Sequence, residues 1–323
     1  MFRLNYFRRI FKVYLTKDKG YLNFWHERPA VSEGISKDEL GPYYMTFEDK
    51  ARYRGPKDKD GIILFDYYFD IGRQYNPLSV AQYGLGHYNL YLKTGKAEHL
   101  DIAEAQAEWL IKNLEPNEKN IYVWKHKFPW HYKQNLASGW FSAHSEGAGI
   151  SLLARLYQET KNTRYLNCAE KAFVSLQTKI EDGGVKFTDT EHNVWLEEYL
   201  INPPTHILNG FLWALWGVWD YHLLTRNLDA KNIFDACVAT LKKNLSAYDN
   251  GFWSLYDLSK QKMKMIASPF YHKLHIVQLT ATGLISGEPV FREYADRFKK
   301  YEQSRLNRAR ALIHKTIFKL LYF

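Results

Sequence analysis

The chain has 323 residues, and its 44 Lys and Arg outnumber its 35 Asp and Glu to give a formal net charge of +9. This length can bury a sizeable core, and the positive charge favours an acidic partner, either nucleic acid, an anionic membrane or an acidic polysaccharide. Because the basic residues form no dense patch and no nucleic-acid-binding motif occurs, we expect no nucleic-acid partner. The two cysteines, Cys168 and Cys237, lack metal-ligand spacing and fit buried thiols in a reducing compartment.

Residues 1–74 are rich in Lys, Asp, Gly and Tyr and show no helical periodicity. Segments 41–47 and 62–69 have the composition of strands, and the Lys-Asp-Lys-Asp-Gly run at 57–61 predicts a turn between them. We therefore expect an irregular arm with a β-hairpin instead of an independent domain. The first ten residues lack the apolar core and cleavage site of a signal peptide, so we expect a cytoplasmic protein, peripheral to the inner membrane at most.

From Pro77 the apolar residues recur at helical spacing. Helices are predicted to open at Pro77 and to cover 102–114, 146–159, 163–179, 205–225, 229–246, 272–284 and 288–304. They come in pairs separated by turn-rich loops, such as Asp-Gly-Gly at 182–184 and Asp-Asn-Gly at 249–251. This pattern predicts a mostly α fold, an α/α barrel built as an incomplete toroid of helical hairpins over residues 75–302.

The last segment, 303–323, interleaves apolar residues such as Leu312, Ile317 and Leu320 with Arg and Lys. A basic amphipathic helix of this kind is typical of a peptide lying on an anionic membrane surface. A terminal helix docked on its own domain or on a partner subunit has the same pattern, and the sequence does not separate the two interpretations.

Three short segments place tyrosines beside acidic or basic residues at the edge of a predicted helix. They are Trp-Leu-Glu-Glu-Tyr at 195–199, Leu-Tyr-Asp-Leu at 255–258 and Phe-Tyr-His-Lys-Leu-His at 270–275. Loops on a rigid scaffold often carry the chemistry of a protein. A carboxylate and tyrosines in one cleft can remove a carbon-bound proton from one face of a sugar and return one to the other. In a chain with 24 tyrosines, each of them also fits a core position with its hydroxyl bonded.

In chain order, these segments resemble the heparosan D-glucuronyl C5-epimerases. The resemblance covers residues 75–301 and rests on segments 81–85, 138–143, 195–211, 255–258, 271–279 and 288–294. It implies an α/α catalytic domain, a glucuronate-containing glycosaminoglycan-like substrate, and a homodimer. We expect the N-terminal arm or the C-terminal helix to contribute to this dimer, because the aromatic-rich termini offer apolar contact surface. Two departures stand out: residues 85–137 leave no room for the inserted β-rich domain of the animal enzymes, and Ser259 replaces their arginine.

The resemblance implies Glu198 and Tyr271 as the opposed proton-transfer pair, with Tyr199 and Tyr256 beside them. Cations would favour ionised tyrosines, and His272, Lys273 and His275 are the candidates. Expected substrate contacts are Gln82, Tyr83, Trp140, His144, Glu197, Asn209, His272, Lys273 and His275. Epimerisation of this kind needs neither a metal ion nor a redox cofactor, so we expect none.

Three other functions remain open at this stage. A uronate polysaccharide lyase begins with the same C5 proton abstraction and then eliminates the 4-linked sugar. A non-catalytic protein that binds acidic glycans has the same charge and aromatic content. A glycoside hydrolase ranks lowest, because Glu198 has no obvious second acid at a suitable spacing.

Overall fold

The computed structural model describes residues 24–26, 28–67 and 71–322 of the chain. Four helical hairpins follow one another in the part that is described. They are α3 (Pro77–Thr94) with α4 (Ala97–Asn113), α5 (Ala143–Thr160) with α6 (Thr163–Gln177), α7 (Leu208–Thr225) with α8 (Leu228–Asn244), and α9 (Pro269–Ser286) with α10 (Pro289–Gln303). A further helix, α11 (Arg305–Tyr322), follows. The prediction of a mostly α fold made of paired helices is confirmed.

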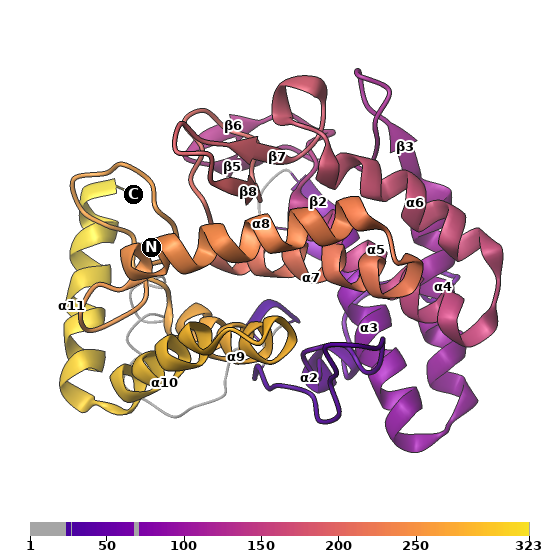
Figure 1. Ribbon diagram of the computed structural model, residues 1–323, viewed down its shortest axis with the longest axis horizontal. Coiled ribbons are helices and arrows are strands. Elements are labelled where there is room, and N and C mark those ends of the chain that lie inside the picture. Colours follow the sequence, from indigo (N-terminus) through magenta and orange to yellow (C-terminus); the bar gives the residue numbers. More distant parts are fainter. Residues whose placement is uncertain (1–23, 27, 68–70, 323) are drawn as a thin grey trace.

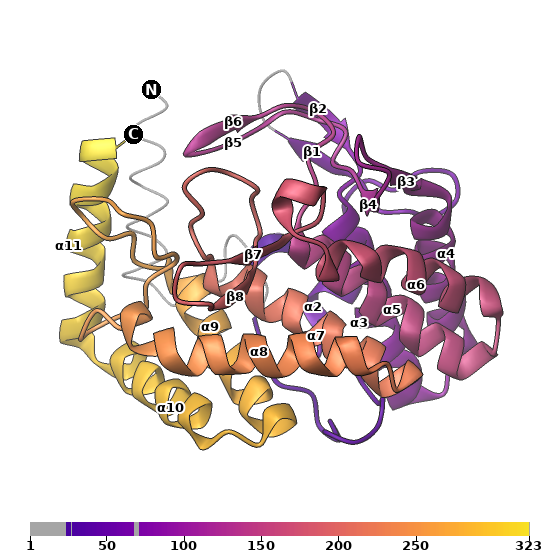
Figure 2. The same cartoon turned by 45° about the horizontal axis from the view of Figure 1, so that its top comes forward.

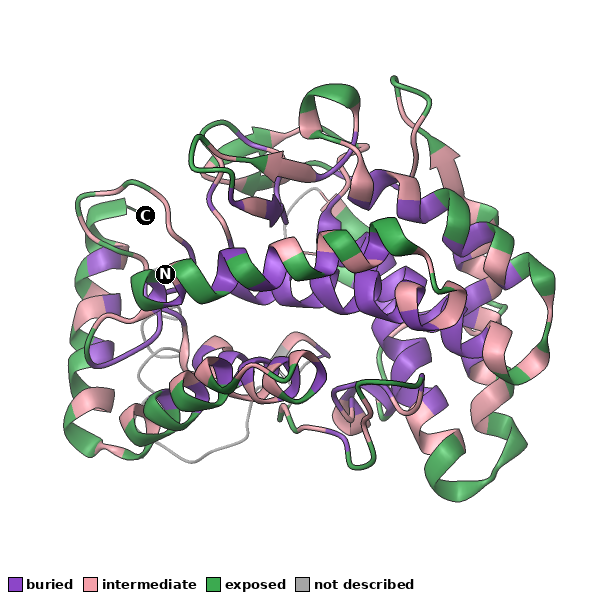
Figure 3. Cartoon of the chain, viewed as in Figure 1, coloured by how far each residue is buried: buried purple, intermediate pink, exposed green. Residues whose placement is uncertain are grey.

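The helices form an inner and an outer row (Figure 1). Helices α3, α5, α7 and α9 pack against one another in succession, and each is covered on the outside by its hairpin partner. The inner helix α7 is apolar all round and buried almost throughout, whereas the outer helix α8 buries one face and exposes the other (Figure 3). Because the row is curved but not closed, the fold is the incomplete α/α toroid that the sequence predicts.

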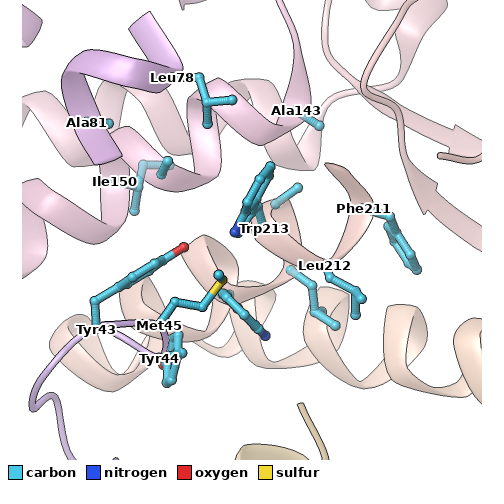
Figure 4. Packing of buried hydrophobic residues seen from close by; sticks show 14 of the residues in the cluster. Tyr43, Tyr44, Met45, Leu78, Ala81, Ala143, Ile150, Phe211, Leu212 and Trp213 are labelled. Atoms are coloured by element: carbon cyan, nitrogen blue, oxygen red, sulfur yellow. The ribbon is translucent and has the colours of Figure 1, made fainter. Parts of the chain in front are cut away.

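Residues 28–51 pack against the helical core. The Tyr44 hydroxyl donates to Asp220 on α7 at 2.6 Å, and Asp220 also pairs with the buried Arg155 of α5. The rings of Tyr43 and Tyr44 lie 5.7 and 5.2 Å from the Trp216 ring of α7, and Tyr43, Tyr44 and Met45 belong to the same buried cluster as Leu212 and Trp213 (Figure 4). The short helix α2 (Glu48–Ala51) lies between α9 and α3 in both views, on the open side of the ring (Figures 1 and 2).

The prediction of a strand at 41–47 is wrong. Its side chains are buried on both faces against the helices instead of alternating, and only an isolated bridge joins Val31 to Met45. The hairpin of this region instead pairs β1 (Phe65–Tyr67) with β2 (Gly72–Gln74). The last two residues of the expected strand 62–69, like the first 23 residues of the chain, lie outside the described residues.

Three more hairpins connect the helices on the side where the inner helices begin (Figure 2). They are β3 (Leu114–Pro116) with β4 (Tyr122–Trp124), β5 (Trp130–Tyr132) with β6 (Gln134–Leu136), and β7 (Lys186–Thr188) with β8 (Val194–Leu196). Single turns of 3-10 helix occur at Phe24–His26 (η1), Ile180–Asp182 (η3) and Leu245–Tyr248 (η4). Among the described residues, no helix is both long and apolar enough to span a bilayer.

Candidate active site

A cavity of about 240 Å³ lies where the four inner helices begin. Its wall includes Asn76 and Leu78 of α3, Trp140 and His144 of α5, Asn209 and Trp213 of α7, and Phe270 and Tyr271 of α9, each within or just before the first two turns. The N-terminus of a helix carries a partial positive charge from its unpaired N–H groups. Four such ends around one cavity favour a negatively charged ligand.

Glu198 supplies the carboxyl group of this cavity. It follows strand β8, lines the cavity and is only 4% exposed. Burial raises its pKa to about 8, the charges of Glu197 and Asp257 act in the same direction, and hydrogen bonds from Tyr199 and Asn209 partly oppose them. The Asn209 amide nitrogen donates to Glu198 Oε2 at 3.4 Å. A carboxyl group with this pKa can accept and release a proton near neutral pH, as general acid–base catalysis requires.

Glycine is required where Glu198 meets helix α7. A Cβ atom added at Gly210 would lie 2.2 Å from Glu198 Oε2 and 2.8 Å from its Cβ. We expect Gly210→Ala to push the carboxyl group out of place and to lower kcat/KM at least about tenfold, since small displacements of catalytic groups are costly. Gly283→Ala is the matched control, because an added Cβ there meets only ordinary contacts at 3.5 Å. Equal activity of the two variants, both checked for helix content by circular dichroism, would contradict this placement of Glu198.

Three tyrosines, Tyr199, Tyr256 and Tyr271, line the cavity with Glu198. The rings of Tyr256 and Tyr271 meet edge to face at 5.0 Å between their centroids, and Tyr199 stacks on Tyr132 at 4.5 Å. Burial and the nearby charge of Glu198 raise the pKa of all three hydroxyls above the usual value of tyrosine. They are therefore neutral proton donors at pH 7.

The prediction that His272, Lys273 and His275 place cations beside these tyrosines is wrong. Lys273 is exposed and forms an ion pair with Glu302 at 3.2 Å. Burial lowers the pKa of His272 to about 3 and that of His275 well below its usual value, so both rings are neutral. None of the three residues lines the cavity.

The two histidines instead hold the loop that carries Tyr256. The Ser254 hydroxyl lies 2.7 Å from Nδ1 of His272 and 2.9 Å from Nδ1 of His275. The His272 ring also stacks on Trp253 at 3.8 Å. They act as positioning residues for the segment that precedes Tyr256.

Three other expected substrate contacts are also placed elsewhere. Glu197 does not line the cavity, and its carboxylate pairs with His206 Nδ1 at 2.5 Å. Gln82 is fully buried inside the helical core, and the Tyr83 hydroxyl accepts a hydrogen bond from Lys57 at 2.6 Å. The expectation that Gln82, Tyr83 and Glu197 contact the substrate does not fit these positions.

Trp140, His144 and Asn209 do line the cavity, as expected, and Trp213 joins them. His144 Nδ1, Asn209 Oδ1 and Trp213 Nε1 are buried atoms without a hydrogen-bond partner in the part of the chain that the structure describes. Their side chains are at most 6% exposed. Because these three side chains line the cavity, their unpaired atoms are available to hydrogen-bond a polar ligand there.

Sequence reasoning missed the contribution of the N-terminal segment. Trp25, Lys50 and Tyr67 line the cavity. The Lys50 side chain is buried, and its ammonium group donates to the Phe24 carbonyl at 2.7 Å and lies 4.2 Å from the centre of the Phe24 ring. The segment shows no periodicity that would reveal which of its residues turn inward.

Aromatic residues from the 126–140 region form another wall, namely His126, Phe128, Trp130 and Trp140. Trp140 stacks on His126 with 3.7 Å between ring centres. The density of aromatic residues in this loop was the available sequence signal for this wall. Among the described residues, no group of three His, Cys, Asp or Glu side chains is arranged to hold a metal ion.

Residues 117–300 match the family model described as "D-glucuronyl C5-epimerase C-terminus". The chain belongs to this family. It is 31% identical over 228 residues to the D-glucuronyl C5-epimerase of Caenorhabditis elegans, an alignment that covers 64% of this chain and 36% of the nematode protein. It is also 30% identical over 220 residues to an uncharacterized protein of Methanocaldococcus jannaschii, which covers 66% of this chain and 67% of that protein. The chain thus spans only about a third of the nematode enzyme.

Solved structures with a related shape include the cellobiose 2-epimerase of Spirochaeta thermophila, with a TM-score of 0.48, 12% identity and coverage of 68% of this chain and 57% of that one. A family 76 glycoside hydrolase from a bovine Bacteroides thetaiotaomicron strain has a TM-score of 0.46 and 15% identity, covering 67% and 46% of the two chains. Likenesses this distant bear on neither reaction nor substrate.

The region that matches the C5-epimerase family holds only part of the cavity wall. Glu198 and the tyrosines Tyr199, Tyr256 and Tyr271 lie within it, whereas Lys50 and Asn76 lie before it. The epimerase-family domain of this chain is therefore completed by residues that the family match does not include.

Proposed function

We propose that this member of the D-glucuronyl C5-epimerase family converts D-glucuronate into L-iduronate residues within a heparosan-like polysaccharide by two-base proton transfer. The observation that carries the proposal is the Glu198 carboxyl group, whose pKa is raised to about 8, in one cavity with the neutral hydroxyls of Tyr199, Tyr256 and Tyr271. An acceptor and several donors of protons thus surround one small space.

The reaction requires stabilisation of negative charge as well as proton transfer. Removing the C5 proton moves the electron pair of the C–H bond into the carboxylate and forms an enediolate, whose added charge must be offset. The four helix N-termini and the Lys50 ammonium group supply positive potential at the cavity. Trp213 Nε1 is a further donor without a partner among the described residues.

The proton balance of the forward step involves two residues. The Glu198 carboxylate takes the C5 proton, and the Tyr271 phenol gives a proton to the opposite face of C5, which leaves neutral Glu198 and a Tyr271 phenolate. Exchange with solvent then resets the pair, and Tyr256, in edge contact with Tyr271, relays the proton. No electron leaves the substrate, so the step needs no oxidant.

An acidic polymer fits the remaining features of the site. The net charge of +9 attracts polyanions, and the Trp25, Trp130 and Trp140 side chains at the cavity provide flat surfaces for sugar rings. Asp257 accepts hydrogen bonds from Tyr132 and from Lys133, so hairpin β5–β6 is fastened over the loop that carries Tyr256. The proposed substrate therefore lies between this hairpin and the inner helices.

The proposal is tested by incubation with heparosan in deuterated water. We expect deuterium at C5 and a growing fraction of iduronate by NMR. Ultraviolet absorption of an unsaturated uronate would instead identify a lyase. Binding of heparosan without any C5 exchange would identify a non-catalytic glycan-binding protein, and either result would contradict epimerisation.

Lys50 provides a separate test of charge stabilisation. We expect Lys50→Met to lower kcat/KM at least about tenfold, mainly through kcat, because the extra charge develops only in the transition state. Lys273→Met removes an exposed cation outside the cavity and is the matched control. Since Lys50 is buried, thermal melting must show that the variant is folded. A folded Lys50→Met protein with the activity of the control would remove Lys50 from the mechanism.

A further inference from the structure

Helix α11 carries an unusual concentration of exposed apolar residues. Of ten large hydrophobic residues that are exposed in the described chain, six lie on this one helix, and the other four are scattered over the rest of the molecule. The six are Leu306, Ile313, Ile317, Leu320, Leu321 and Tyr322. We call the first five the α11 stripe; they are spaced by seven, four, three and one residues and so share one face of the helix. A contiguous apolar surface of this kind normally has a partner.

The opposite face of α11 fixes the helix to the molecule. Ala311 and Phe318 are buried there, and the Lys315 ammonium group donates to the Ile266 carbonyl at 2.7 Å. At the border between the two faces, the exposed Arg310 guanidinium group lies 4.4 Å from the centre of the Phe252 ring. The helix stands at the edge of the molecule (Figure 1), so the α11 stripe is held in a defined orientation facing outward.

The charge of α11 indicates what covers the stripe. The helix contains Arg305, Arg308, Arg310, Lys315 and Lys319 and has no Asp or Glu. Arg305 and Arg310 are exposed beside the stripe. An apolar stripe bordered by basic side chains is the pattern of helices that lie in the interface of anionic membranes. Pairing with α11 of a second copy would bring two purely basic helices together, so like charges oppose that arrangement.

We propose that the α11 stripe docks this protein onto the surface of an anionic phospholipid membrane. Leu306, Leu320 and Leu321, each at least 66% exposed, enter the boundary between headgroups and acyl chains. The exposed Arg305 and Arg310 side chains meet the phosphates. The helix lies in the interface and does not cross it. This inference is independent of the proposed reaction, and the predicted homodimer would have to use a different surface.

One loop connects helix α11, which we propose docks on the membrane, with the cavity. Lys315 holds Ile266, which bridges to Leu255, and the backbone N–H of Tyr256 donates to the carbonyl of Met265 at 2.8 Å. The loop with Tyr256 therefore rests on the helix that docks. A protein bound in this way presents its cavity in a fixed orientation to polymer near the membrane.

The test is sedimentation of the full chain with vesicles. We expect binding to vesicles of phosphatidylcholine with phosphatidylglycerol, little binding to pure phosphatidylcholine, and release at high salt. The double variant Leu320→Glu with Leu321→Glu should lower the vesicle partition coefficient at least about tenfold. It lacks two apolar side chains that would be buried among the lipid chains, and anionic lipid repels the new charges. The control is Leu228→Glu, a residue that is 74% exposed on α8. It should bind like the unchanged protein.

Two results would overturn the proposal. The first is equal vesicle binding by the double variant and the control. The second is a wild-type protein that does not bind anionic vesicles and is a dimer in sedimentation velocity, while the double variant is a monomer. That outcome would assign the α11 stripe to a second copy of the chain. Because Leu320 and Leu321 are two-thirds exposed, we expect both variants to fold normally, as thermal melting would verify.

Discussion

Tyr271→Phe is expected to lower net epimerisation at least about a hundredfold, the usual scale for loss of a general acid or base. The substitution keeps the ring and its edge contact with Tyr256 but removes the oxygen that would carry the proton. Folding should change by only about 1 kcal/mol, because one hydroxyl is lost. Exchange of the C5 proton on the face that Glu198 serves should persist weakly, since that half of the reaction keeps its base.

The measurement is deuterium exchange at C5, made separately on chains that contain glucuronate and on chains that contain iduronate. Tyr91→Phe is the control, because it deletes a tyrosine hydroxyl that bonds to Glu159 outside the cavity. Near-normal epimerisation by Tyr271→Phe would contradict the assignment of Glu198 and Tyr271 as the two proton-transfer residues. Tyr256 or Tyr199 would then have to supply the second proton, and the same substitution at each would identify it.

The helical hairpins were predictable from sequence because each row of helices has its own signature. Outer helices such as α6 and α8 repeat apolar residues every three or four positions, and inner helices such as α7 are apolar nearly throughout. Boundaries were less accurate. Helix α4 begins at Ala97, five residues before the predicted start, because Ala97 and Glu98 in its first turn are exposed and give no apolar signal for the start of the helix.

The tyrosines of the site were predictable as a group, but the directions of their neighbours were not. Glu197 and Glu198 follow strand β8, where successive side chains point to opposite sides, so only one of the two enters the cavity. On α9, Tyr271 and Lys273 are two residues apart and therefore face different directions. A sequence motif treats neighbouring residues as one group, whereas the repeat of a strand or helix directs their side chains to different sides.

The contribution of Lys50 was beyond sequence reasoning for a different reason. Segment 28–51 is mostly irregular, and its position is set by long-range contacts such as the hydrogen bonds between Asn89 and the backbone around Tyr43. Neither propensity nor periodicity encodes contacts of this kind. The Lys50 ammonium group at the cavity thus comes from a segment whose structure the sequence pattern did not predict.

Glu198→Gln is expected to lower epimerisation roughly a thousandfold, within the range for loss of general acid–base catalysis, while making the protein more stable at neutral pH. The amide keeps the shape of the side chain and cannot exchange a proton with C5. Exchange should then be weak on both substrates but should favour the C5 configuration opposite to that favoured by Tyr271→Phe. In the unchanged enzyme, kcat/KM should rise with pH through the pKa of about 8 that burial gives Glu198, and this limb should vanish in the variant.

The stability gain follows from the same pKa. The usual pKa of the group is 4.5, and in the folded protein it is raised to about 8. Between these values the folded state holds a proton that the unfolded chain has released, so rising pH destabilises the unchanged protein across this window. At pH 7 the penalty is about 3 kcal/mol, from 1.36 kcal/mol for each pH unit above 4.5. Glutamine has no such penalty.

Thermal melting of both proteins from pH 4.5 to 8.5 tests this. The advantage of Glu198→Gln should be smallest at the acidic end, grow with pH and level off above about 8. The other buried carboxyl with a raised pKa, Glu146, is present in both proteins and cancels in the difference. A constant difference in melting temperature across the range would mean that Glu198 is already ionised in the folded enzyme. The pKa of Glu198 would then lie near its usual value of 4.5, and ionisation of this group could not produce the expected rise of kcat/KM near pH 8.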